Sequence, residues 1–360
     1  MKEKVLYELR KSGNSYVSGE ALSELLGVSR TAIWKYVREL REKGYNIQSS
    51  SKKGYKLSNV PDLNADEIAN GLQTNILGKS IIYLDTVDST NRFAKRASLE
   101  GCQDGTVIVS ECQTSGRGRL GRDWHSGRGK GIWMSVVLRP SIAPEDVQII
   151  TLAAAVAVVK AIKYVTGIET AIKWPNDIIL DGKKLCGILT EMSCEVERVS
   201  FLILGIGINV SHNKEDFPQD LRDIATSLKI FSKSNETSSI FNRSEIIKRV
   251  LFELEQMYNK INIGAANETD QQNIDVKTGN DNGQQFITAE TNNYIAQQFI
   301  ASEWRKYSLT LGKEINVTGR NTQFTGIAED ITNDGRLIVR GHDGVQHELL
   351  SGEVSIRGEQ

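Results

Sequence analysis

Hydrophobic residues in the first sixty positions recur at helical spacing in three successive segments. They are Val5, Leu6 and Leu9 in the first, Leu22, Leu25 and Leu26 in the second, and Ile33, Val37 and Leu40 in the third. This spacing predicts helices over 1–11, 18–26 and 29–43, with Gly27 ending the second helix and Ser29 capping the third. Two short strands around SSSKKG, over 45–57, follow as a hairpin. The order indicates a winged helix-turn-helix domain.

From about residue 79 to 307 the chain alternates short apolar runs, typical of buried strands, with helical segments. Strands are predicted at 81–84, 106–112, 132–138, 169–174, 177–180, 184–192 and 199–210, and helices at 66–72, 91–99 and 144–165. The strands at 177–180 and 184–192 are only a hairpin apart, so the sheet cannot be purely parallel. This part is predicted to be a mixed α/β domain.

The last hundred residues change character twice. Residues 261–298 are a mixture rich in Asn, Gln, Thr and Asp, which predicts a disordered insertion. Residues 299–307 resume helical spacing, and 312–357 contain short alternating strands with turns, which predicts a small SH3-like β-barrel. The expected fold is therefore α+β, with domains at 1–60 (winged helix-turn-helix), 61–307 (mixed α/β) and 308–360 (barrel).

The composition indicates the class of protein and its cellular compartment. The 360 residues carry a net charge of −1, with 39% hydrophobic and 25% charged residues, which is ordinary for a soluble globular protein. The four cysteines have no metal-ligand spacing, and the apolar run 149–159 is too short to span a bilayer. We expect a cytoplasmic protein with free thiols and no membrane partner.

Charge is unevenly distributed in the first domain. Over 1–58, about twelve Lys and Arg face about six Asp and Glu, the excess typical of a nucleic-acid-binding module. The side chains expected to reach DNA are Arg30, Thr31, Trp34, Lys35 and Arg38 on the third helix, and Lys52 and Lys53 on the wing. The alternative is a three-helix domain with a solvated basic face.

The stretch QTSGRGRLGRDW at 113–124 contains G-x-G-x-x-G, a pattern of dinucleotide-binding turns. That turn needs a helix opening at its third glycine, whereas more glycines and the strand at 132–138 follow here. The loop's five cations are Arg117, Arg119, Arg122, Arg128 and Lys130. A glycine-rich loop with this charge is predicted to close over an anion.

Three further polar stretches flank predicted strands. They are DTVDSTN at 85–91, KWPND at 173–177 and GKKLCGIL at 182–189. The first alone is more often a helix cap, and a strand lysine such as Lys184 is more often an exposed edge residue. With Gly187 beside it, however, Lys184 is well placed to meet a phosphate or carboxylate.

Together, DSTN, GRGRLGRDW, KWPND, KLCGIL and GIGINV, preceded by a winged helix, resemble the biotin–protein ligases that also repress biotin operons. The resemblance covers almost the whole chain. It implies that ATP and biotin form biotinyl-5′-adenylate, that biotin passes to a lysine of a biotin carboxyl carrier protein, and that Mg²⁺ assists. It also implies that the adenylate acts as corepressor, driving a homodimer onto operator DNA.

The resemblance implies roles for individual residues. Ser89, Thr90, Asn91, Gln113, Gly116, Arg117, Arg119, Lys184 and Gly187 would bind biotin, with Lys184 and Arg119 holding its carboxylate and the α-phosphate as catalytic residues. Arg119, Arg122, Trp124, Lys173, Asn176, Asn209 and, in the tail, Arg357 would bind ATP, with Glu353 nearby. Asp177 would contact Mg²⁺.

Leu120 departs from the pattern, because many relatives carry a basic residue there. Two other functions stay open. One is a lipoate-type ligase of related fold, against which WPND and the winged helix argue. The other is a ligand-sensing repressor without catalysis, which the presence of Lys184 and the loop arginines disfavours.

Overall fold

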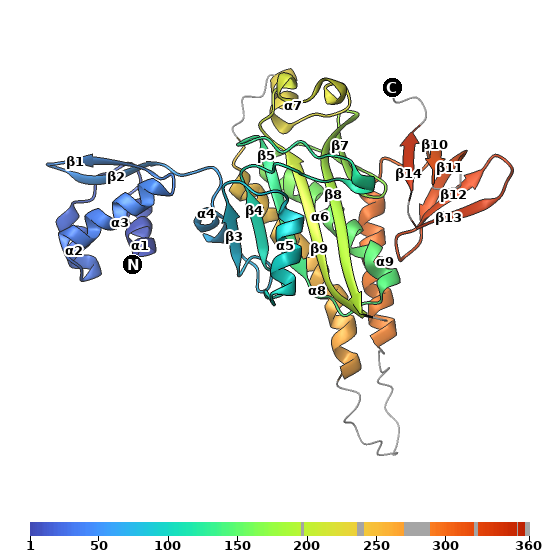
Figure 1. The fold of residues 1–360 in the computed structure, drawn as a ribbon, viewed down its shortest axis with the longest axis horizontal. Coiled ribbons are helices and arrows are strands. Elements are labelled where there is room, and N and C mark those ends of the chain that lie inside the picture. Colours follow the sequence, from blue (N-terminus) through green and yellow to red (C-terminus); the bar gives the residue numbers. More distant parts are fainter. Residues whose placement is uncertain (196–197, 236–240, 270–288, 320–322, 351, 357–360) are drawn as a thin grey trace, which may run out of the picture. The chain divides into compact units, whose positions relative to one another are not determined.

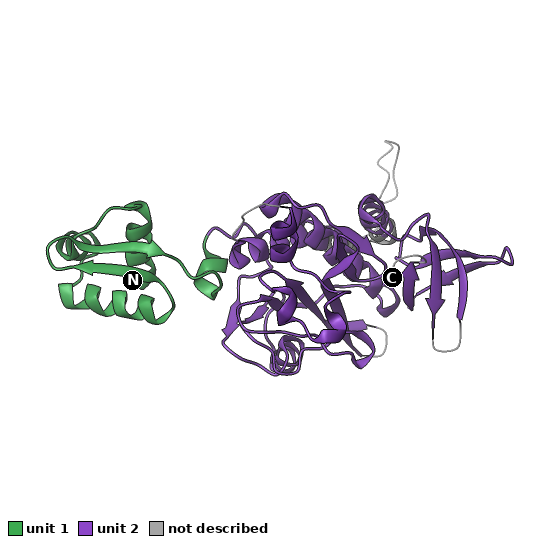
Figure 2. Cartoon of the chain, turned by 90° about the horizontal axis from the view of Figure 1, so that it is seen from above, with its two compact units in different colours: residues 1–70 green, residues 71–360 purple. Residues whose placement is uncertain are grey.

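The structure is a computed structural model that describes residues 1–195, 198–235, 241–269, 289–319, 323–350 and 352–356. It divides into two compact units, 1–70 and 71–360 (Figure 2). Each is described by itself.

The first unit is the predicted winged helix-turn-helix. Its elements are α1 (Lys2–Lys11), α2 (Gly19–Leu26), α3 (Arg30–Glu42), β1 (Asn46–Ser50), β2 (Gly54–Asn59) and α4 (Ala65–Ala69). The hydroxyls of Ser18 and Ser29 accept from backbone N–H groups and cap α2 and α3, and Gly27 ends α2 with φ 64°. The apolar faces of α1, α2 and α3 form one buried core. Helix α4 is shorter than the predicted 66–72.

The second unit contains a seven-stranded sheet with the order β3-β4-β5-β9-β8-β7-β6 (Figure 1). Its strands are β3 (Ile81–Leu84), β4 (Val107–Ser110), β5 (Gly131–Leu138), β6 (Ala171–Lys173), β7 (Asp177–Leu180), β8 (Lys183–Glu195) and β9 (Arg198–Asn209). Among the described strands, only β3 and β4 pair in parallel. The prediction of a mixed sheet is confirmed.

Helices cover both faces of this sheet. Helix α5 (Thr90–Leu99) lies on one face, and α6 (Gln148–Thr166) lies on the other, with α8 (Arg243–Thr269) and α9 (Ala289–Tyr307) packed against α6 (Figure 1). A short 3₁₀ turn, Pro144–Val147, leads into α6. This segment, Pro144–Thr166, is apolar and long enough to cross a membrane, but 72% of its apolar window is buried inside the protein. It is the central core helix.

The interpretation of 261–298 as a disordered insertion is wrong at both ends. Helix α8 continues to Thr269 and α9 begins at Ala289, while residues 270–288 lie outside the described residues. Ile261 and Ala296 are buried, as is Ile300 further along α9. In the described part of α9, buried residues recur at helical spacing among exposed polar ones, so polar residues dominate the local composition.

The C-terminal strands form a five-stranded antiparallel sheet, with the order β13-β12-β11-β10-β14. They are β10 (Glu314–Thr318), β11 (Gln323–Ile331), β12 (Leu337–Gly341), β13 (Gln346–Leu349) and β14 (Glu353–Ile356). Buried Trp174 joins this sheet to the central one, because its indole N–H donates to the carbonyl of Gly335 at 3.1 Å. Closure of these strands into an SH3-like barrel, and the three domain boundaries, stay predictions.

Candidate active site

A cavity of about 660 Å³ lies on the α5 side of the sheet and brings the separate motifs together. Its walls include Ser89, Thr90, Asn91, Gln113, Arg117, Arg119, Arg122, Trp124, Lys173, Asn176, Asp177, Lys184, Gly187 and Asn209. Two of the predicted site residues are not among those that line the cavity. Gly116 is buried behind the wall, packed against Gln113 and Trp124, and Arg357 lies outside the described residues.

Glycines on two adjacent strands form the floor of the cavity. Gly187 of β8 pairs with Gly207 of β9, and Gly205 follows on the same face. The indole of Trp124 lies against Gly187 and Gly207, where any Cβ would collide with it. The absence of side chains therefore provides the space that Trp124 and a ligand share.

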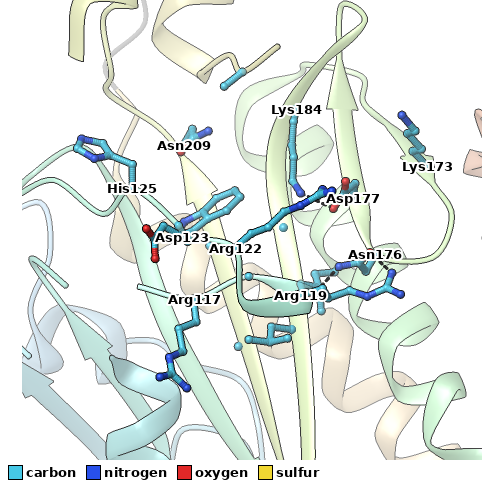
Figure 3. A pocket seen from close by; sticks show the side chains of 18 of the residues that line it. Arg117, Arg119, Arg122, Asp123, His125, Lys173, Asn176, Asp177, Lys184 and Asn209 are labelled. Atoms are coloured by element: carbon cyan, nitrogen blue, oxygen red, sulfur yellow. Dashed lines mark hydrogen bonds and ion pairs between the residues drawn. The ribbon is translucent and has the colours of Figure 1, made fainter. Parts of the chain in front are cut away.

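A bulge in β8 turns Lys184 toward the cavity. Ile178 and Ile179 of β7 pair with Cys186 and Lys184, so Leu185 is an extra residue. Strict alternation would put Lys184 on the same face as Cys186, which is fully buried. Instead its ammonium lies 2.7 Å from Asp177 Oδ1 and 5.5 Å from the centre of the Trp124 ring (Figure 3).

The glycine–arginine loop contains a single 3₁₀ turn, Arg119–Gly121, where a dinucleotide-binding turn would open a helix. Arg119 Nη1 donates to Asn176 Oδ1 at 3.0 Å, as Figure 3 shows, and its Nη2 donates to the carbonyl of Gly352 at 3.3 Å. Burial lowers the pKa of Arg119 from its ordinary value, opposed by the charges of Asp177 and Glu353. Arg119 thus connects the loop to KWPND and to the C-terminal sheet.

The five loop cations separate into two groups. Arg117, Arg119 and Arg122 line the cavity. Arg117 points away from the Lys184–Asp177 pair in Figure 3. Arg128 instead forms a bidentate pair with Asp85, at 2.5 and 2.7 Å, and Lys130 pairs with Asp216 at 2.7 Å. The prediction that all five cations close over one anion is wrong for Arg128 and Lys130, since each is paired with a carboxylate that is distant in the sequence.

At the opposite end of the cavity the polar groups are neutral and buried. The backbone N–H and the hydroxyl of Thr90 donate to Gln113 Oε1, at 2.8 and 3.1 Å. Gln113 Nε2 donates to Ser126 Oγ at 2.8 Å. Ser89 is the N-cap residue of α5, yet its hydroxyl makes no capping hydrogen bond. This end can therefore recognise a small neutral polar ring.

Sequence reasoning missed Ser126 and Ser135, which hold this neutral end together. Ser135 Oγ lies 2.8 Å from Thr90 Oγ1 and 2.6 Å from Asn91 Oδ1. A lone serine inside the buried strand Gly131–Leu138 is the signal that could have found Ser135. No comparable signal marks Ser126, which a loop places beside Gln113.

Asn209, predicted to bind ATP, is buried at the end of β9 and lines the cavity with the segment 217–225. Behind that segment, His212 is fully buried and stacks on Phe217 with ring centres 4.6 Å apart. Burial, and then the charge of His125, lower the pKa of His212 to about 4. His212 is thus a neutral core residue at neutral pH, and His125 lies on the cavity wall.

Asp177, the predicted Mg²⁺ ligand, lies beside Lys184 in the cavity wall. No cluster of three or more His, Cys, Asp or Glu suited to a metal ion lies within the described part of the chain. Mg²⁺ is commonly bound by one or two carboxylates together with substrate phosphates. The donor set fits an ion that arrives with a nucleotide.

The predicted DNA-contacting residues are all exposed in the first unit. They are Arg30, Thr31, Trp34, Lys35 and Arg38 of α3, and Lys52 and Lys53 at the tip of the hairpin. The Arg38 guanidinium lies over the Trp34 ring at 5.2 Å, which supports an indole that is 52% exposed. This surface has the chemistry of a recognition helix and a wing.

Comparison with known proteins gives three family models in the same order as the domains. They are an HTH domain over 2–56, the biotin/lipoate A/B protein ligase family over 83–209, and the biotin protein ligase C terminal domain over 310–357. The bifunctional ligase/repressor BirA of Bacillus subtilis (strain 168) is 37% identical over 96% of this chain and 95% of its own length. BirA of Escherichia coli (strain K12) is 32% identical over 56% of this chain and 61% of its own.

A solved structure agrees with this. The biotin protein ligase from Aquifex aeolicus, in complex with biotin and ATP, matches with a TM-score of 0.57 and 29% identity. The match covers 78% of this chain and 99% of the other.

Proposed function

The chain belongs to the family of bifunctional ligase/repressors, and on that premise we propose that it joins biotin to ATP and transfers biotin to a carrier protein. The acceptor would be a lysine of a biotin carboxyl carrier protein. The observation that carries this proposal is a single cavity with a neutral hydrogen-bonding end and a cationic end. Biotin has the same division, with a neutral cyclic urea and a carboxylate.

The residues at the cationic end suit the first half-reaction. Attack of the biotin carboxylate on the α-phosphorus of ATP brings two anions together, so it needs fixed positive charge. Lys184 and Arg119 would hold the carboxylate and the α-phosphate, and Arg122 and Lys173 would contact the nucleotide with Asn176. Magnesium bound with ATP would neutralise phosphate charge beside Asp177.

The glycine–arginine loop would protect the adenylate, the product of the first half-reaction, from water. The adenylate is a mixed anhydride, which water would hydrolyse. Trp124 covers the glycine floor, and the loop around Gly116 and Arg117 closes the wall above Gln113. Exclusion of water from this space keeps the intermediate for the carrier lysine.

The first unit supports the second activity. We propose that a homodimer carrying the adenylate places two copies of α3 on paired operator half-sites, as a repressor of biotin genes in the cytoplasm. The support is the exposed basic surface of α3 and the wing.

Pyrophosphate release tests the ligase, with Mg-ATP and either biotin or lipoate as the acid. We expect release with biotin. Pyrophosphate release with lipoate but not with biotin would favour a lipoate-type ligase. No release with either acid would favour a repressor without catalysis.

Footprinting on promoter DNA of the biotin genes of the source organism tests the repressor. We expect protection of two half-sites when biotin and ATP are both present, and loss of protection in Arg38→Ala. Protection that does not depend on biotin would contradict the corepressor role.

A further inference from the structure

A chain of hydrogen bonds runs from the buried neutral end of the cavity to Glu191, an exposed carboxylate outside it. Asn91 Nδ2 donates to Glu191 Oε2 at 2.6 Å. Asn91 Oδ1 faces Ser135 Oγ at 2.6 Å, and Ser135 Oγ faces Thr90 Oγ1 at 2.8 Å. Thr90 and Asn91 line the cavity, whereas Ser135 and Glu191 do not.

The carboxylate is the nearest acceptor for the Asn91 NH₂, at 2.6 Å against 3.5 Å to the carbonyl of Leu189, and it orients the donors in this chain. An ionised carboxylate only accepts hydrogen bonds, so Glu191 fixes the NH₂ of Asn91 toward itself and the carbonyl Oδ1 toward Ser135. That carbonyl has no hydrogen to offer, so Ser135 must give its single O–H to Asn91. Asn91 is 5% exposed, and leaving its Oδ1 without a donor would be costly.

The state of Thr90 follows from this assignment. With the Ser135 hydrogen used, the Thr90 hydroxyl donates to a protein acceptor, either Ser135 Oγ or Gln113 Oε1. Both acceptors lie within the protein, so Thr90 has no hydrogen for a ligand. Its lone pairs, which Ser135 leaves unoccupied, accept a hydrogen bond from the cavity.

We infer that Glu191 is a positioning residue that acts through Asn91 and Ser135 to fix the Thr90 hydroxyl as an acceptor for a ligand N–H. The inference rests on the proposed function, because a cyclic urea supplies such an N–H and a dithiolane ring does not. Asn91, predicted as a direct biotin contact, thus has both ends of its amide committed to the protein.

The position of Glu191 agrees with this role. Gly187, Leu189 and Glu191 share the cavity face of β8 by two-residue alternation, and Glu191 lies past the end of the cavity. If Glu191 is lost, only the long 3.5 Å bond to the carbonyl of Leu189 holds the Asn91 NH₂, which can then turn toward Ser135. The Ser135 hydrogen then occupies one lone pair of Thr90, and the acceptor strength toward the ligand falls.

The test is Glu191→Ala in the full-length chain, with biotin titrated calorimetrically and pyrophosphate release followed with Mg-ATP. We expect the Kd and KM for biotin to rise about three- to tenfold, the range of one neutral hydrogen bond, with kcat unchanged. In Thr90→Val, adding Glu191→Ala should change the Kd no further, since its effect passes through Thr90.

Thr190→Val is the matched control. Thr190 is the next residue on β8, and its hydroxyl bonds Thr151 of α6 at 2.8 Å on the opposite face. The Thr190→Val variant should have a lower Tm but an unchanged Kd for biotin. The role inferred for Glu191 would be overturned if Glu191→Ala left the Kd for biotin unchanged. It would also be overturned if Glu191→Ala weakened biotin binding equally in the wild-type and Thr90→Val backgrounds. Neither result would affect the proposed function. Failure of the wild type to bind biotin would overturn the proposed function and, with it, the role inferred for Glu191.

Discussion

At one end of the cavity Thr90 is 3% exposed and hydrogen-bonded to Gln113, whereas at the other the Arg122 side chain is 69% exposed and paired with Glu353 at 2.5 Å. Lys184, at the same end, is paired with Asp177. The neutral end therefore has its hydrogen bonds fixed before a ligand arrives. The cationic end has its charges compensated by carboxylates, which an anionic ligand must displace.

The difference indicates how specificity and catalysis are divided. Buried, partnered polar groups reject ligands that leave them unsatisfied, so under the proposed function the neutral end would select the acid. The Arg122–Glu353 pair is exposed and therefore weak, so under the proposed function Arg122 would exchange Glu353 for a substrate anion at small cost. Variants at the two ends should consequently differ in which kinetic constant they change.

The largest effect is expected for Lys184→Ala. It should lower kcat/KM for pyrophosphate release by roughly 10²- to 10³-fold, because a fixed charge near the reacting anions is lost. Calorimetry without ATP should show the Kd for biotin changed less than about tenfold. Lys183→Ala is the control, since Lys183 does not line the cavity. An equal loss in both variants would remove Lys184 from the site.

At the neutral end, Gln113→Ala should raise the Kd for biotin roughly tenfold, because it removes the acceptor for Thr90 and the donor to Ser126. Titration of biotin in the absence of ATP measures this. Thr114→Ala changes an exposed neighbour and should leave the Kd unaltered. If kcat fell while the Kd held, the division between the two ends would be wrong.

Acid should weaken the packing behind the cavity. The pKa of His212 is about 4 in the folded protein, below its ordinary value of 6.5. The unfolded chain therefore binds a proton that the folded one does not, and stability falls as the pH drops from about 7 to 4. In His212→Phe, the Tm difference between pH 7.5 and pH 5 should shrink by a few degrees, roughly 2–4 °C per kcal/mol. An unchanged difference would contradict the lowered pKa.

The smallest effect is expected for Glu353→Gln. Its exposed pair with Arg122 should contribute under about 1 kcal/mol to the free energy of unfolding, measured by urea denaturation. Release of Arg122 should lower the KM for ATP about two- to threefold, the change of a weak ion pair. A higher KM would show that Glu353 binds the nucleotide and does not merely compensate Arg122.

Much of the fold could be predicted because its signals are local. The caps Ser18 and Ser29, and Gly27 at the end of α2, are short-range features that the sequence states directly. The exposed polar face of α9 hides its beginning, since buried residues such as Ala296 and Ile300 recur there only at helical spacing. Loop charge was also misleading, because Asp85 and Asp216 are far from Arg128 and Lys130 in sequence.

Sequence motifs indicate most of the residues that line the cavity. They do not indicate the residues whose contacts depend on how the strands pair. The motif predicts Lys184 as a ligand-binding residue, but no sequence signal predicts the bulge at Leu185 that turns it toward the cavity. Ser126, Ser135 and Glu191 act through partners between 13 and 100 positions away. Such contacts follow from strand pairing and loop placement, which periodicity does not determine.

The floor of Gly187, Gly205 and Gly207 has an evolutionary consequence. Any missense change in a glycine codon adds atoms, because no smaller residue exists, and at these sites the added carbon meets Trp124 or Asn91. A library of random variants should therefore be depleted at these three codons for every replacement, alanine included. Gly19, at the start of α2, has no left-handed φ and its Cβ would meet only Tyr55, at 3.4 Å, so it should accept at least some of the same replacements.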